Sequence, residues 1–181
     1  MKFLLSNWPV CLLILCALLI GLYLLRKSNN IIDMRDIISN HFDLLKEDLF
    51  TIVVFIFVPI ISSMSCAFLR CVTADIINNI NISLSIFIAL QFAIAGILCS
   101  IPAGNNAYEK IKKQAFNEIL FECVLTILSL VLSFAILFVG INKINTIVLL
   151  IISAMLYCLV FNTVMNIFIV LKRLKLLFDE R

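Results

Sequence analysis

The chain has 181 residues, of which 64% are hydrophobic and 14% are charged, and its mean hydropathy is +1.17. Soluble domains are about 45–50% apolar and about 25% charged, so this composition excludes a water-soluble globular core. The net charge of +3 is too small to indicate a nucleic-acid partner, and no direct nucleic-acid binding is expected. The composition instead predicts the lipid bilayer as a partner and an all-α fold, a polytopic membrane helical bundle.

The first long apolar run covers residues 3–25, and Arg26 and Lys27 follow it directly. It is longer than the apolar region of a signal peptide, and no A-x-A cleavage site follows it. We therefore interpret it as a retained span, since a helix needs about 20 apolar residues to cross the hydrocarbon core.

The hydrophilic segment 26–47 comes next. Its apolar residues recur at helical spacing, at Ile31, Met34, Ile38, Phe42 and Leu45, and its acidic residues fall on another face. This pattern predicts a short cytoplasmic amphipathic helix that lies on the membrane or against a partner. A solvated helical extension of the next span is the alternative.

The second span, residues 49–69, carries a proline near its middle. Pro59 is expected to kink the helix because it removes one helical hydrogen bond. Ser62, Ser63 and Ser65 follow within a turn and could bond the carbonyl groups that the proline frees. Such a kink can line a pore, although it serves helix packing more often.

The third span, residues 83–103, carries a stripe of small residues. Ala89, Ala93, Gly96 and Ser100 are spaced by four, three and four, so they share one face and would let another helix approach closely. Gln91 is the one strongly polar residue deep in this span, and we expect it to form a hydrogen bond across a helix interface.

Residues 118–141 and 146–171 form two further apolar runs, separated by a short polar break. Each run is long enough to cross the bilayer, and the break predicts a tight turn, so together they form a membrane hairpin. The hydrophilic segment 105–116 precedes this hairpin, and the basic tail 172–181 follows it.

Four polar residues of the hairpin, together with Gln91, are candidates for polar coupling inside the membrane. We expect Glu118 in the headgroup zone and Glu122 about a turn deeper, where an ionisable side chain indicates a functional site. An interfacial carboxylate paired with a nearby lysine is the alternative. Antiparallel pairing of the two spans would bring Asn162 and Asn166 to the level of Glu122.

Lysine and arginine are concentrated in alternate hydrophilic segments, namely 26–47, 105–116 and 172–181. The positive-inside rule assigns these segments to the cytoplasm. The result is one membrane domain over residues 1–181, with five spans, the N-terminus outside and the C-terminus inside. Four spans are the alternative if residues 3–25 do not cross.

The cytoplasmic segments hold nearly all of the polar residues, yet they are too small for a catalytic domain, so a cytoplasmic protein partner is expected. The candidate contact residues are Ile38, Phe42, Leu45, Lys172, Arg173 and Lys175.

Catalytic and cofactor motifs are absent from the sequence. It contains no phosphate-binding glycine loop, no H-E-x-x-H and no G-x-S-x-G. The seven cysteines form no C-x-x-C pair and lie far from the one histidine, so no metal site or other cofactor is predicted. Ser39, His41 and Asp43 lie close together in the sequence, but His41 and Asp43 point to different faces of one helix. We therefore expect no enzymatic activity.

The last span runs into a basic stub, N-T-V-M-N-I-F-I-V-L-K-R-L-K-L-L, and the chain is rich in Ile, Leu, Phe and Asn with very short loops. In this layout it resembles the membrane component (KwaA) of the Kiwa anti-phage defence system. The resemblance covers the whole chain, although that family is described with four spans. It implies an inner-membrane homo-oligomer that senses phage infection and controls a cytoplasmic, DNA-binding effector.

Three functions follow from these observations. The first is a non-enzymatic inner-membrane sensor subunit that oligomerises and controls a cytoplasmic effector protein. The alternative is an oligomeric channel or pore, which the proline and serines of the second span and the polar residues Gln91 and Glu122 would line. The third is a membrane enzyme that acts on lipid substrates.

Overall fold

A computed structural model describes residues 34–45, 49–102, 104, 106–141 and 144–179. The predicted first span, 3–25, lies outside the described residues. The chain divides into two compact units, Met1–Ser39 and Asn40–Arg181. The architecture below is that of the second unit.

Every regular element among the described residues is a helix, which confirms the predicted all-α fold. The elements are α3 (Met34–Leu45), α4 (Leu49–Ile52), the π-helix η1 (Val53–Phe57), α5 (Val58–Leu69), α6 (Ala74–Ser100), α7 (Asn106–Val139) and α8 (Thr146–Asp179). Four helical stretches in this part of the chain are long and apolar enough to cross a membrane: Phe50–Leu69, Ala74–Ser100, Tyr108–Val139 and Thr146–Asp179. The protein is therefore a helical membrane protein.

The long helices extend beyond the apolar runs that predict them. Helix α6 begins at Ala74 rather than at 83, α7 includes most of the polar segment 105–116, and α8 continues through most of the tail. A helix ends where a capping or breaking residue stops it, and a fall in hydropathy alone does not end it. Thr73 supplies such a start, because its hydroxyl accepts a hydrogen bond from the Ile76 amide.

Helix α7 is followed by a glycine whose backbone conformation most other residues adopt only with strain. Gly140 has a φ of 82°, in the left-handed region that glycine enters freely, and its amide donates to the Ile136 carbonyl. The chain then turns back into α8, as the predicted hairpin requires.

The kink predicted at Pro59 takes the form of a π-helix. Proline lacks an N–H and crowds the carbonyl four residues earlier, and η1 widens the helix just before Pro59 enters the first turn of α5. The Ser63 hydroxyl donates to the Ile60 carbonyl at 2.8 Å. The prediction that Ser63 bonds a carbonyl freed by the proline is therefore wrong. Ser62 is half-buried and Ser65 is exposed.

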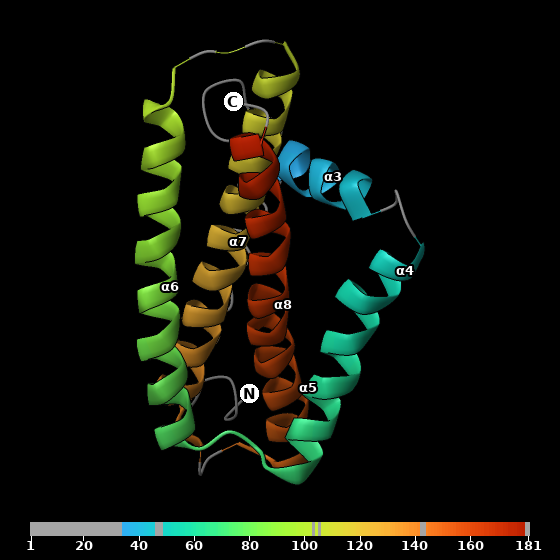
Figure 1. Ribbon diagram of the computed structural model, residues 1–181. Helices are drawn as coiled ribbons and strands as arrows, with labels where there is room; N and C mark the ends of the chain where they lie inside the picture. The colour runs from blue at the N-terminus through green and yellow to red at the C-terminus, as the bar shows by residue number, and fades with distance from the viewer. Residues whose placement is uncertain (1–33, 46–48, 103, 105, 142–143, 180–181) are drawn as a thin grey trace. The chain divides into compact units, whose positions relative to one another are not determined.

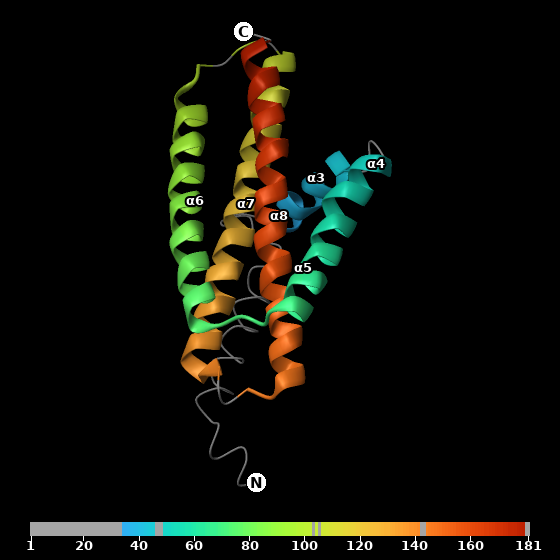
Figure 2. The same cartoon turned by 60° about the horizontal axis from the view of Figure 1, so that its bottom comes forward.

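Helix α7 packs between α6 and α8, and α8 also packs against α5 (Figure 1). Consecutive helices from α5 to α8 alternate in direction, and Figure 2 shows α6, α7 and α8 side by side from a second angle. Two clusters of buried apolar residues join them. One includes Leu98, Ala115, Ile119 and Val170, and the other consists of Val72, Ile77, Ile136 and Leu156.

The end of α6, the start of α7 and the end of α8 meet at one end of these three helices (Figure 1). Lysines of α7 and α8 therefore gather there, although the segments that carry them are far apart in the sequence. We call this the basic end. The α5–α6 connection and the α7–α8 turn lie at the opposite end.

Candidate functional site: the buried polar face of helix α7

Helix α7 turns its polar residues inward. Glu118, Glu122, Thr126, Ser129 and Ser133 are spaced by four, four, three and four, so they share one face, and each is at most 2% exposed. The opposite face is apolar and exposed, for example at Val131, Phe134 and Phe138. This arrangement suits a helix in lipid, where polar side chains are stable only when other helices cover them. We call the inward residues the polar face.

The first residue of the polar face, Glu118, is bonded to the single histidine of the chain. Its Oε2 lies 2.8 Å from His41 Nδ1, and the two side chains are 1% and 6% exposed. The His41 ring also stacks on Phe121, with the ring centroids 3.8 Å apart and the planes 15° from parallel. His41 belongs to the part of α3 that lies in this unit, residues 40–45, so this contact, which we call the His41–Glu118 junction, joins that part of α3 to a spanning helix.

The structure corrects one expectation about these carboxylates. Glu118 is buried by the helices and by His41, while its expected depth in the headgroup zone stays a prediction. Glu122 has no lysine partner in the part of the chain that the structure describes, where Gln91 is a hydrogen-bond partner of its side chain and Glu118 is a neighbouring charge. Sequence reasoning missed His41, since no local pattern connects it to a residue 77 positions away.

Gln91 of α6 forms the predicted cross-helix hydrogen bond. Its Nε2 donates to Thr126 Oγ1 at 3.2 Å, and that hydroxyl in turn donates to the Glu122 carbonyl at 2.8 Å. Both side chains are buried. This bond attaches α6 to the polar face at the level of Glu122.

Asn162 and Asn166 of α8 have different roles. The Asn162 amide donates to the Cys158 carbonyl on its own helix at 2.8 Å, so it does not reach Glu122. Asn166 is 4% exposed, and its Nδ2 has no hydrogen-bond partner among the described residues. A hydrogen bond of 3.2 Å from Arg173 to Gln114 sets the register of α7 against α8. Since both helices rise equally per residue, this register places Asn166 near the level of Glu122, as predicted.

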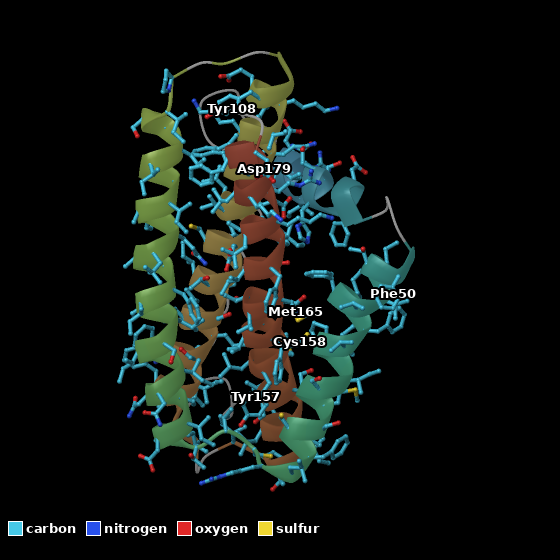
Figure 3. All side chains as sticks on the ribbon, in the orientation of Figure 1. Phe50, Tyr108, Tyr157, Cys158, Met165 and Asp179 are labelled. Carbon is cyan, nitrogen blue, oxygen red and sulfur yellow. The ribbon has the colours of Figure 1, made fainter. Side chains whose placement is uncertain are left out.

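The far part of the polar face reaches the end opposite the basic end. Ser133 donates a hydrogen bond to Asn81 Oδ1 of α6. Nearby, the Val72 amide donates to Ser153 Oγ of α8 at 3.0 Å. Figure 3 marks Tyr157 toward this end of α8, where its hydroxyl donates to the Arg70 carbonyl, and Tyr108 at the other end of α7. The polar spacing along α7 was the one sequence signal that could have predicted this row.

The remaining candidate residues lie away from the polar face. Ala89, Ala93, Gly96 and Ser100 are exposed on α6. Lys172 and Lys175 are exposed, and Arg173 donates a hydrogen bond to Gln114. On α3, Phe42 is 43% exposed and Ile38 is partly exposed. The side chain of Leu45 lies outside the described ones.

Comparisons with known proteins leave the site to be interpreted from its own geometry. No protein-family model matches the chain, and no curated protein or solved structure matches it either. Within the described ranges, no group of three or more His, Cys, Asp or Glu side chains is placed to hold a metal ion.

Proposed function

We propose that this protein is a non-enzymatic, multi-pass subunit of a bacterial inner membrane, which assembles as a homo-oligomer and controls a cytoplasmic effector protein, as an anti-phage defence sensor would. The observation that supports this most is the His41–Glu118 junction. It connects the amphipathic helix α3 to the interior of a spanning helix. A rearrangement of the spanning helices that moved Glu118 would therefore change how α3 is held.

The basic end offers a surface for an acidic protein partner. Lys110 and Lys113 of α7 and Lys172 and Lys175 of α8 are exposed, and the helix ends that carry them lie together (Figure 1). By the positive-inside rule this end faces the cytoplasm, with the C-terminus inside. Phe42 of α3 is exposed and offers a separate apolar contact for a partner.

The small-residue stripe of α6 supports assembly with further copies. Its members are exposed, and a Cβ atom added at Gly96 would have no neighbour within 4 Å. Small residues allow close approach of helices in lipid. Replacing Gly96 by leucine is therefore expected to shift the oligomer toward smaller species, measured by native mass spectrometry in lipid nanodiscs. The matched control is Ser65→Leu, a similar enlargement of an exposed small residue on α5, which is expected to leave assembly unchanged.

Phage challenge of the native host tests the proposed function directly. Cells that carry the intact protein with its neighbouring genes are compared with cells that carry His41→Ala or Asn40→Ala at equal membrane abundance. We expect His41→Ala to abolish protection while Asn40→Ala, an exposed change in the same helix, preserves it. Equal phage plating on cells with and without the intact protein would refute the defence role.

A second experiment separates partner binding from signalling. Lys172→Gln with Lys175→Gln is expected to release a soluble partner that co-purifies with the intact protein, whereas Arg70→Gln, an exposed change at the opposite end, is expected to retain it. His41→Ala should keep the partner bound but lose the response. Retention of the partner by the double lysine variant would contradict the basic end as its docking surface.

The channel alternative rests on one observation, the continuous polar face of α7. Thr126 and Ser129, however, bond to carbonyl groups of their own helix at 2.8 Å, and Ser133 bonds to Asn81 of α6, so these hydroxyl groups are already satisfied without water. Ion flux into liposomes that is sensitive to Glu122→Gln would favour a channel over a sensor.

A further inference from the structure

Four buried side-chain atoms lack a hydrogen-bond partner among the described residues, and all four belong to the middle of α6, α7 and α8. They are Gln91 Oε1, Glu118 Oε1, Glu122 Oε1 and Asn166 Nδ2. No water is present in the hydrocarbon core to satisfy such atoms, so unpaired polar groups there are unfavourable. Three of the atoms belong to neighbouring side chains, since Gln91 is a hydrogen-bond partner of Glu122 and Glu118 lies close enough to act on its charge. A ligand between these side chains would occupy the free bonding directions.

The orientation of Gln91 leaves its carbonyl oxygen free. Thr126 has one hydroxyl hydrogen and donates it to the Glu122 carbonyl, so toward Gln91 it can only accept. The contact at 3.2 Å therefore requires Gln91 to present its Nε2 to Thr126. Gln91 is 5% exposed and is also a side-chain hydrogen-bond partner of Glu122, while its own Oε1 remains unpartnered among the described residues.

The groups around Glu122 supply no positive charge to its carboxylate among the described residues. On α7 the facing charged group is Glu118, whose Oε2 is already bonded to His41 of α3. Helix α6 contributes the neutral Gln91, and α8 contributes the neutral Asn166 at this level. A single positive charge would balance an ionised Glu122.

The available donor atoms fit a hard cation. Two carboxylate oxygens and one amide oxygen are unpartnered there, and oxygen ligands of this kind bind hard cations inside membrane proteins. Asn166 Nδ2 is a hydrogen-bond donor, so it would bond to a carboxylate oxygen that does not bind the cation. A group of three anionic or imidazole ligands, as a divalent metal would favour, is not found in the described ranges.

We propose that Gln91, Glu118 and Glu122 form a binding site for a monovalent cation, sodium or a proton, inside the membrane. The cation satisfies the unpartnered oxygens of the three side chains. This site requires neither a protein partner nor the proposed sensor role. Its presence would bind α6 to α7 next to the His41–Glu118 junction.

Cation-dependent unfolding of the full chain in lipid nanodiscs tests the site. Thermal unfolding is measured in sodium, potassium and choline chloride at equal ionic strength and over a range of pH, together with direct binding of radioactive sodium. A saturable rise in the unfolding temperature with sodium, or a rise on acidification alone, identifies the ion as sodium or as a proton. Identical unfolding under all of these conditions would overturn the proposal.

Two variants and a control assign the response to these residues. Glu122→Gln is expected to abolish the cation response. Gln91→Met keeps the length of the side chain at position 91 and leaves the carboxylates of Glu118 and Glu122 in place, and it should weaken cation binding at least tenfold. Ser129→Ala alters the same buried face without touching the oxygens and should respond like the original chain. If Glu122→Gln does not fold, Gln91→Met decides the question. An undiminished response in Gln91→Met would also overturn the proposal.

Discussion

Replacing His41 by alanine is expected to release α3 from α7. The histidine holds Glu118 through a buried bond of 2.8 Å and stacks on Phe121. Loss of one partner from a buried pair costs about 3–5 kcal/mol in soluble proteins, whereas side-chain hydrogen bonds inside membrane proteins average about 0.6 kcal/mol. The stacked ring adds about 0.5–1.5 kcal/mol. Because this bond is fully buried but belongs to a membrane protein, we expect a loss between these limits, about 2–3 kcal/mol.

Hydrogen exchange of the backbone amides of residues 40–45 measures this loss locally. At about 1.4 kcal/mol for each factor of ten, the expected change is a roughly 30–150-fold faster exchange of this segment in His41→Ala. The full chain in lipid nanodiscs is the appropriate sample. Asn40→Ala, an exposed change in the same helix, is the control and is expected to exchange like the original chain.

A double-mutant cycle with Glu118→Gln shows whether the two side chains act together. Each single change is expected to destabilise the segment, and the double variant should lose clearly less than the sum, since the pair is broken only once. Strict additivity, or exchange of His41→Ala at the original rate, would refute the reasoning that this junction holds α3.

Three further changes test the packing of the helices by unfolding in mixed detergent and lipid. Leu156→Ala, at a fully buried position, is expected to lose about 2–4 kcal/mol, while the exposed Met155→Ala loses little, and equal losses would contradict the assigned faces of α8. Ser153→Ala leaves the Val72 amide unpaired and is expected to lose about 1–3 kcal/mol, so an unchanged stability would argue against that hydrogen bond. Gly140→Ala forces a side chain into the left-handed region and is expected to lose about 1–2 kcal/mol, whereas a gain in stability would contradict the turn geometry.

Sequence patterns predicted the spans better than the helix ends. The runs around Pro59, Gln91 and Glu122 all lie in helices that can cross a membrane, as expected. The helix ends depend instead on local stops such as Thr73 and Gly140, which hydropathy does not detect. The π-helix before Pro59 could not be predicted from the sequence either. A helix can accommodate the missing hydrogen bond and the crowding of a proline in several ways, and the packing of neighbouring helices selects one of them.

The sequence by itself determined that the described chain consists of long apolar helices, because in lipid each backbone polar group must be satisfied within its own helix and apolar length alone reveals such a segment. Only the tertiary structure decided which face of α7 is inside and that His41 pairs with Glu118. The physical reason is that lipid is as apolar as a leucine side chain, so apolar residues do not indicate which face is buried. That choice depends on polar contacts between helices, and these join residues far apart in the sequence.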